Sequence, residues 1–190
     1  MILLRKKLAF ILGFVLLILS GCAAAEPAQL PLTFRTELLQ AGTCSFTAEV
    51  CADYGDTVAP FTLACVWTPD GTELTVAQPD SIAGISARVA DSAAYVTYDD
   101  AQLGLGSLAD GALAPLAAPY VLAQCWAGEY IDATGTEDGL LRVRYRMGYE
   151  TQELVVDTWF QTEPAAPVRA EIYHDGQMQL RVQMTDFRVG

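Results

Sequence analysis

The sequence predicts an α+β domain, in which an antiparallel sheet has one apolar face and an apolar helix covers that face. Three observations lead to this prediction. Apolar and polar residues alternate along most of residues 140–187, as in strands that bury one side only. Asp-Gly pairs at residues 70–71 and 175–176 divide such segments and favour tight hairpin turns. Residues 110–126 carry no charge after Asp110 and are largely apolar, as in a buried helix.

In chain order, the first element expected is a short amphipathic helix over residues 32–42, because Gly42 is typical of the position that ends a helix. Two strands follow, around residues 44–51 and 60–68, joined by a turn at residues 54–56. If these strands pair, Cys44 and Cys65 fall on one apolar face. We therefore expect either a Cys44–Cys65 disulfide or, as the default, free buried thiols.

The apolar helix within residues 110–126 is expected to begin near Pro115 or Pro119, since proline is tolerated in a first helical turn. The segment is too short and too rich in proline to be a good transmembrane span. It is the best candidate to cover the sheet.

The last four strands divide their residues between two faces. The apolar face holds Leu141, Val143, Tyr145, Leu154, Val156, Phe160, Val168, Ala170, Ile172, Leu180, Val182 and Met184. The other face carries Arg142, Arg144, Arg146, Glu153, Asp157, Arg169, Glu171 and Arg181. We interpret the charged face as solvated and paired across strands, in preference to an anion site.

The start of the chain has the layout of a secretory signal peptide. Arg5, Lys6 and Lys7 precede an unbroken apolar run over residues 8–19, which is shorter than the roughly 20 residues that cross a bilayer. The sequence from Leu19 to Cys22, Leu-Ser-Gly-Cys, looks like the lipobox of bacterial lipoproteins. This resemblance implies cleavage before Cys22 and diacylglycerol on its sulfur. The alternative is a retained anchor or an ordinary signal peptide with a chance cysteine.

This interpretation divides the chain into three parts. Residues 1–21 are the expected signal peptide, residues 22–32 a lipidated tether, and residues 33–190 one folded domain. The expected location is the cell membrane, with the domain anchored by lipid on the extracytoplasmic side.

The charge of the mature chain excludes some partners. Without residues 1–21 it keeps eight arginines and no lysine against 23 acidic residues, a formal charge near −15. Such a surface repels the phosphates of nucleic acids and anionic lipid headgroups. We therefore expect no nucleic-acid partner, and we expect membrane contact through the lipid on Cys22.

Signatures of catalysis are missing from the sequence. The only histidine, His174, stands beside an expected hairpin turn, and neither a Gly-x-Ser-x-Gly elbow nor a His-Glu-x-x-His helix occurs. The acidic pairs lack the spacing of a calcium loop. We expect no catalytic residue, no metal and no cofactor.

The order of elements resembles the LolA/LolB-like fold of bacterial lipoprotein-localisation factors. Residues 66–100, the apolar helix with Pro115 at its start, and residues 164–187 carry the likeness. It implies that the sheet is a strongly curved half-barrel, with the helix as a lid over an apolar cavity that accepts acyl chains. Germination lipoproteins of spore-forming bacteria, such as GerS, are also similar, and a lipid cargo does not follow from that likeness.

Two functions fit these observations; we expect the first, and the second is the alternative. In the first, the half-barrel binds an acyl lipid or acylated ligand. The expected lining is Phe46, Leu63, Trp67, Tyr120, Leu122, Trp126, Val143, Tyr145, Val156, Phe160 and Ile172. In the second, the same residues fill the core, and the anchored domain docks an envelope protein without any ligand.

Overall fold

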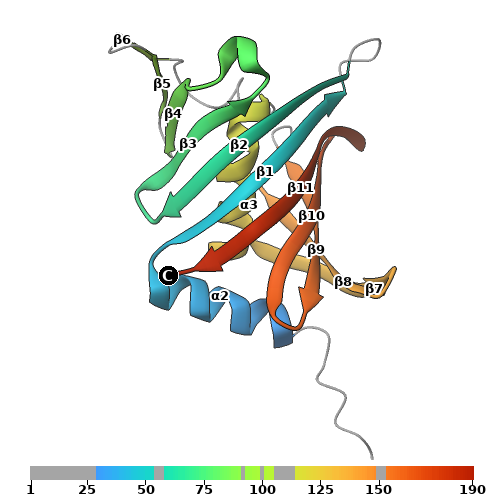
Figure 1. Ribbon diagram of the computed structural model, residues 1–190. Coiled ribbons are helices and arrows are strands. Elements are labelled where there is room, and N and C mark those ends of the chain that lie inside the picture. Colours follow the sequence, from blue (N-terminus) through green and yellow to red (C-terminus); the bar gives the residue numbers. More distant parts are fainter. Residues whose placement is uncertain (1–28, 54–57, 91–92, 99–100, 105–113, 149–152) are drawn as a thin grey trace, which may run out of the picture.

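The computed structural model describes residues 29–53, 58–90, 93–98, 101–104, 114–148 and 153–190. The predicted signal peptide, Cys22 and the turn at residues 54–56 lie outside these ranges. Within them the chain forms two α-helices and eleven strands, shown in Figure 1. Their bounds are α2 Gln29–Ala41, β1 Cys44–Asp53, β2 Val58–Thr68, β3 Gly71–Gln78, β4 Ser86–Ala90, β5 Ala93–Tyr98, β6 Ala101–Gly104, α3 Ala118–Ala127, β7 Tyr130–Glu137, β8 Leu140–Met147, β9 Leu154–Thr162, β10 Ala165–His174 and β11 Gln177–Val189.

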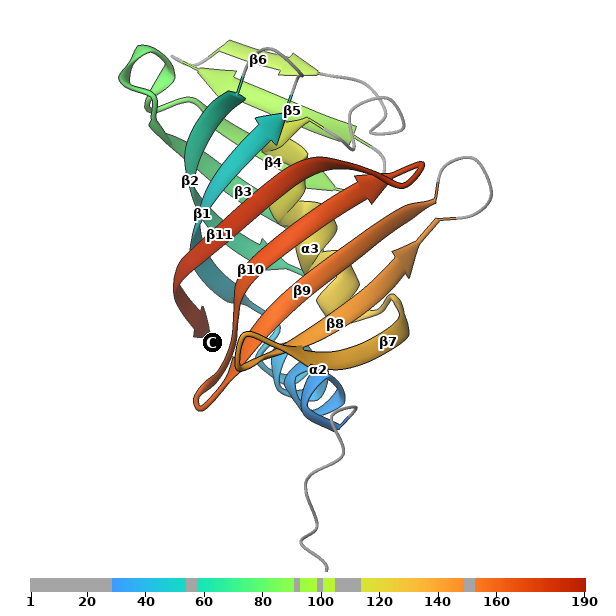
Figure 2. The ribbon, with the colours of Figure 1, turned by 90° about the vertical axis from the view of Figure 1, so that its right-hand side faces the viewer.

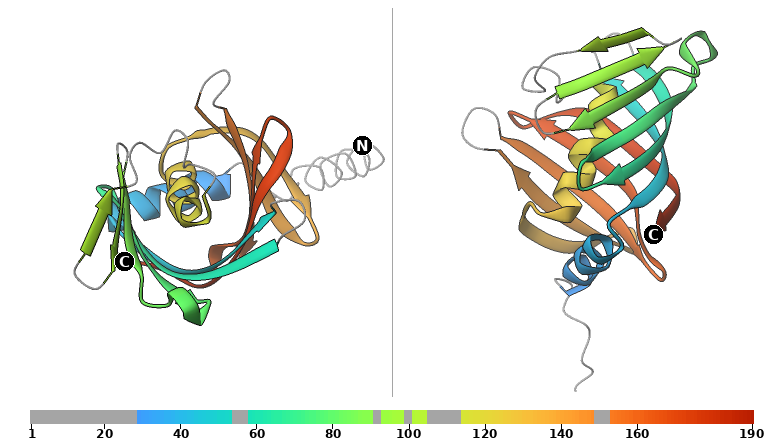
Figure 3. Two further views of the ribbon diagram at one scale, coloured as in Figure 1. Left: turned by 90° about the horizontal axis from the view of Figure 1, so that it is seen from above. Right: turned by 90° about the vertical axis from the view of Figure 1, so that its left-hand side faces the viewer.

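The strands form one sheet in the order β6-β5-β4-β3-β2-β1-β11-β10-β9-β8-β7. Every neighbouring pair is antiparallel. The sheet curves around α3 without closing, as the view from above in Figure 3 shows. The predicted fold class is confirmed: a curved antiparallel half-barrel, an apolar helix in its concavity and a short helix before the first strand.

The position of α3 follows from the topology. β6 and β7 are the two edges of the sheet, and α3 lies between them in the chain. The chain therefore passes from one edge to the other, and α3 lies on this passage across the concave face (Figure 2). An element in that place must be apolar on nearly all sides, because the sheet surrounds much of it.

The helix α2 is longer than predicted. It begins at Gln29 instead of Leu32, so it also includes residues 29–31, which the sequence interpretation placed in the tether. Pro31 fits in the first turn of this helix, because proline lacks only an N–H that the first turn leaves unpaired. The predicted end is confirmed, since Gly42 follows at a φ of +68° and its N–H donates to the Leu38 carbonyl at 3.0 Å.

One of the two predicted Asp-Gly turns is shifted. Asp175 and Gly176, at φ +50° and +75°, join β10 to β11 as expected. In the other hairpin, however, Pro69 and Asp70 form the turn, and Gly71 is the first residue of β3, paired with Thr68. Gly71 is needed in the strand for close packing, because a Cβ there would lie 2.6 Å from the carbonyl oxygen of Val89 in β4.

Neither helix of the described chain is long and apolar enough to cross a membrane.

Candidate functional site

The candidate site is the layer between α3 and the concave face of the sheet. Eight of the ten residues of α3 are buried there. Pro115 opens a 3₁₀ turn over Pro115–Ala117, and Pro119 occupies the first turn of α3, as the sequence predicts. The N–H of Gly128 donates to the Gln124 carbonyl at 2.9 Å and ends the helix.

The eleven side chains predicted to line a cavity lie together in this layer. They come from α3 and from five strands, and none is more than 6% exposed. All of them belong to one apolar cluster, in which each packs against buried neighbours. The structure thus brings the predicted set together, and the side chains occupy the space between sheet and helix. Ligand binding by these residues stays a prediction.

The aromatic centre of the layer is Trp126. Its ring makes edge contacts with Phe34, Phe46 and Phe187 at centroid distances of 6.3, 5.6 and 5.7 Å. Its indole N–H donates to the hydroxyl of Thr158 at 3.3 Å, so the one polar atom of the ring has a partner. These contacts join α3 to α2, β1, β9 and β11.

The sequence interpretation missed Phe187 because it continued the alternation of β11. That alternation places Asp186 on the inner face after Met184. Instead, the register between β1 and β11 shifts between Ser45 and Thr47, and Asp186 takes a φ of +54°. This bulge turns Phe187 inward, where it stacks on Phe46 at 5.8 Å. A bulge of this kind leaves no reliable mark in the amino-acid pattern.

Arg35 on α2 holds the end of α3. Its Nε donates to the Trp126 carbonyl at 3.0 Å, and its Nη2 donates to the carbonyls of Cys125 and Glu129 at 3.2 and 2.7 Å. The last carbonyls of a helix have no partner within the helix, and a cation near them is stabilising. Arg35 supplies both effects and fixes α2 to α3, a role that the sequence pattern did not indicate.

The four cysteines of the domain are free thiols. Cys44 and Cys65 share the buried face, but Cys44 pairs with Trp67 and Cys65 with Phe46, so the two lie diagonally across β1 and β2. The structure therefore has the default state rather than a Cys44–Cys65 bridge. Burial raises the pKa of Cys44 to about 12 and also raises that of Cys125. Thiols with raised pKa values are poor nucleophiles and poor metal ligands.

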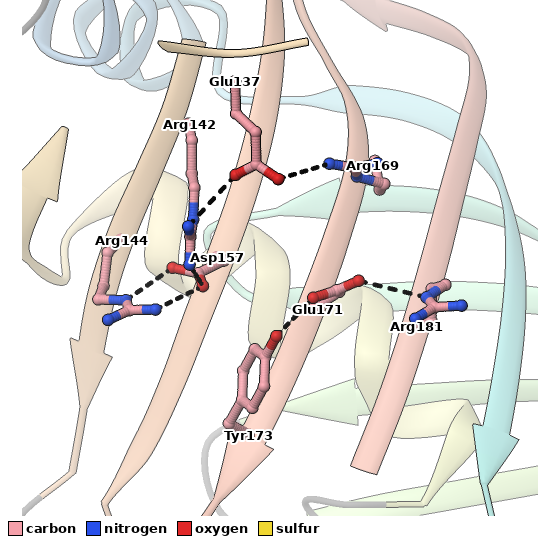
Figure 4. Close-up of polar contacts among 8 residues, drawn as sticks. All are labelled: Glu137, Arg142, Arg144, Asp157, Arg169, Glu171, Tyr173 and Arg181. Carbon is pink, nitrogen blue, oxygen red and sulfur yellow. Dashed lines mark hydrogen bonds and ion pairs between the residues drawn. The ribbon is translucent and has the colours of Figure 1, made fainter. Parts of the chain in front are cut away.

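The outer face of β8, β9, β10 and β11 carries the predicted ion pairs (Figure 4). Arg142 and Arg144 both reach the carboxylate of Asp157 from the neighbouring strand. Arg142 also pairs with Glu137 at 3.2 Å, and Arg181 pairs with Glu171 at 3.2 Å. The interpretation of this face as paired across strands is confirmed for these residues.

One feature of the outer face was not anticipated. Asp157 and Trp159 point away from α3, yet they are 0% and 2% exposed. The guanidinium of Arg169 lies 4.0 Å from the centre of the Trp159 ring, and that of Arg142 lies 5.3 Å from it. The long arginine side chains thus cover the indole, which alternation alone assigns to solvent.

Two hollows are described on the outer side of the sheet. One of about 590 Å³ lies over β1, β2, β3 and β11, and Thr47, Val66 and Arg188 are among the residues that line it. The other, of about 230 Å³, lies beside β7 and β8 next to Arg142 and Arg144. Neither is lined by a residue of α3. Within the described ranges, His, Cys, Asp and Glu side chains form no group of three or more that could hold a metal ion.

No protein-family model matches the sequence, and no curated protein matches it. Similar solved structures exist. One, described as an outer membrane lipoprotein-sorting protein domain from Vibrio parahaemolyticus, has a TM-score of 0.49 and 9% identity, covering 84% of this chain and 90% of that chain. A conserved protein from Thermus thermophilus has a TM-score of 0.48 and 9% identity, covering 87% and 88%. A LolA superfamily protein from Nitrosomonas europaea has a TM-score of 0.47 and 8% identity, covering 84% and 93%.

Proposed function

We propose that the chain is a lipoprotein of the bacterial cell envelope, tethered to the membrane through Cys22, and that its domain docks an envelope protein. In this proposal the domain is not an enzyme and its core holds no ligand. The tether follows from the Leu-Ser-Gly-Cys sequence after a basic and apolar start. Two or three acyl chains on one residue anchor a protein far more firmly than a single chain does.

The packing beneath α3 is the observation that carries the docking proposal. The eleven side chains that could line a cavity contact other buried residues, and the most exposed of them, Tyr120, is only 6% exposed. A site for a ligand of drug or acyl size needs about 300 Å³ or more of open space. Of the two hollows described, the one of that size lies over β1, β2, β3 and β11; Phe46 is the only one of the eleven side chains among its lining residues, and no residue of α3 lines it.

The charge distribution favours the outer face of β7 to β11 as the docking surface. Five arginines and five carboxylates pair there, so their formal charges cancel. The rest of the mature chain then carries the whole excess of about 15 negative charges. A partner can approach this face without the repulsion that the remaining surface produces. Five of the eight arginines of the mature chain lie there, and arginine is enriched at protein interfaces.

A second candidate function is the binding of an acyl chain between the sheet and α3. The layer is apolar throughout its eleven predicted residues, which suits a hydrocarbon chain. The hydrogen bonds of α3 with Arg35 and Thr158 lie near its C-terminal end. In this function a ligand displaces part of α3 from the sheet.

The experiment that separates the two candidates is native mass spectrometry of residues 28–190, purified without detergent and followed by solvent extraction. Docking predicts an apoprotein that stays unliganded after incubation with acyl lipids. A lipid present at one copy per chain would establish the second candidate. The anchor is tested separately: Cys22→Ser should release the full chain from membranes, and continued tight association would contradict the tether.

A further inference from the structure

We propose that the outer face of α2 rests on the membrane, so that the domain contacts the lipid surface through a defined helix. This inference rests on the proposed lipid anchor at Cys22. It concerns the orientation of the domain and holds for either candidate function. The occupant of this helix face is an uncharged lipid surface.

The short tether brings α2 close to the membrane. α2 starts at Gln29, only seven residues after Cys22. A stretch of seven residues spans at most about 25 Å when fully extended. α2 lies across one end of the sheet and is the described element nearest in sequence to the anchor (Figure 1). The length of the chain before α2 therefore keeps this end of the domain within reach of the headgroups.

The exposed face of α2 is almost uncharged. Leu32 and Leu39, two turns apart on the same side of the helix, are 50% and 52% exposed. Of the exposed residues, only Glu37 carries a charge, although the mature chain has a formal charge near −15. The exposed residues of α2 are Gln29, Leu32, Thr33, Thr36, Glu37, Leu39, Gln40 and Ala41. This composition lets the face approach a neutral headgroup layer without burying a cluster of charges.

Two polar groups of α2 are already engaged elsewhere. The Thr36 hydroxyl donates to the Leu32 carbonyl at 2.9 Å, so the hydroxyl keeps a partner when water leaves. Arg35 points to the end of α3 and leaves no cation on the outer face. Recognition by anionic headgroups is therefore not the basis of the contact. The contact is made by the side chains of Leu32 and Leu39, and the uncharged polar residues around them can lie among neutral headgroups.

An exposed aromatic residue lies next to this end of the domain. Tyr130 is 68% exposed, and its neighbour Glu129 accepts a hydrogen bond from Arg35 of α2 at 2.7 Å. Tyrosine is enriched where a protein meets the boundary between lipid and water. Two leucines and a tyrosine bind a bilayer weakly on their own, but a lipid anchor seven residues away raises their effective concentration at the surface.

The test uses the lipidated full chain in phosphatidylcholine vesicles, with and without bromine on the acyl chains. Bromine quenches tryptophan fluorescence at short range. Leu39→Trp places a reporter on the outer face of α2, and Val66→Trp is the matched control, since Val66 is 46% exposed on β2. The native residues Trp67, Trp126 and Trp159 are at most 2% exposed and give a common background.

We expect a blue shift and a loss of emission in brominated vesicles for Leu39→Trp, and neither change for Val66→Trp. Equal quenching of the two variants, or none, would overturn the inference while vesicle flotation still reports an intact anchor. If the wild-type chain does not float with vesicles, or if Cys22→Ser floats equally well, the anchor itself fails and the inference fails with it. Flotation and quenching thus separate the two failures.

Discussion

The carboxylate of Asp157 accepts two hydrogen bonds from the guanidinium of Arg144, at 2.8 Å each, in the middle of an outer sheet face. Arg142 donates to the same carboxylate, and Asp157 is fully buried beneath these side chains. Burial favours the neutral acid, but the hydrogen bonds from Arg144 and Arg142 outweigh it and hold the pKa of Asp157 below its ordinary value. This charged cluster links β8 to β9 on the side opposite α3.

Asp157→Asn should lower the free energy of unfolding by about 2–4 kcal/mol, because it leaves two guanidiniums facing a neutral amide. Urea unfolding measures the loss. Glu153→Gln is the matched control, since it removes a pair with Arg146 at 2.9 Å that is open to solvent. If the two substitutions lower the free energy of unfolding equally, the burial of Asp157 does not make its ion pairs more stabilising than an exposed pair.

The same carboxylate predicts a dependence of stability on pH. Its pKa is lower in the folded than in the unfolded chain, so its stabilising effect is complete above the unfolded value and is lost as the pH falls through the folded value. Stability should therefore decrease from about pH 4 downward. In Asp157→Asn, the free energy of unfolding should fall less steeply at acid pH, because the titrating carboxylate is gone. If the free energy of unfolding of Asp157→Asn falls as steeply below about pH 4 as that of the wild type, the assignment to Asp157 is wrong.

Arg35→Met should loosen the end of α3 and lower the free energy of unfolding by about 2–3 kcal/mol, because three carbonyls lose a charged donor. Hydrogen exchange should accelerate at residues 125–129 in particular. Glu37→Gln on the exposed side of the same helix serves as the control. Unchanged exchange at the end of α3 would mean that Arg35 does not fix it.

Trp126→Ala should cost about 3–5 kcal/mol, as expected for truncation of a fully buried aromatic side chain in a packed core. Thr158→Val separates the hydrogen bond from the packing and should cost much less. If Trp126→Ala costs little and alters lipid binding, Trp126 is a cavity wall, and the filled-core proposal is wrong.

Gly71→Ala should destabilise the domain by about 1–3 kcal/mol, since the new Cβ meets the Val89 carbonyl at 2.6 Å and φ is +138°. Gly135→Ala, where a Cβ meets nothing within 4 Å, should change the stability by less than about 0.5 kcal/mol. Thermal unfolding of the two variants gives the comparison. Similar melting temperatures would show that β3 and β4 can separate at Gly71.

The parts of this fold that could be predicted are those in which the polarity of each residue indicates whether it faces the core or the solvent. The alternation in β8 to β11 identified the inner residues except Val168, which is only partly buried because the register between β9 and β10 shifts between Pro167 and Arg169. The lack of charge in α3 identified a buried helix. The features that were missed depend on partners distant in sequence. Trp159 is buried only because arginines from two other strands lie over it, and Phe187 turns inward only because β11 bulges against β1.

The candidate site shows the same division. Its eleven residues could be selected from the sequence because a cavity lining and a filled core require the same apolar side chains. Whether such a layer is open or filled depends on how side chains from six elements fit together. A pattern of single residues does not contain that information.

The pairing of β1 with β11 at the centre of the sheet has a consequence for how the domain assembles. The first strand described and the last one lie side by side, so a chain made or translocated from its N-terminus cannot complete the sheet until residues 177–189 have emerged. Before that moment β1 presents a bare edge, and contacts this distant in sequence form slowly. A truncation before β11 would therefore yield two half-sheets with aggregation-prone inner edges instead of a slightly shorter domain.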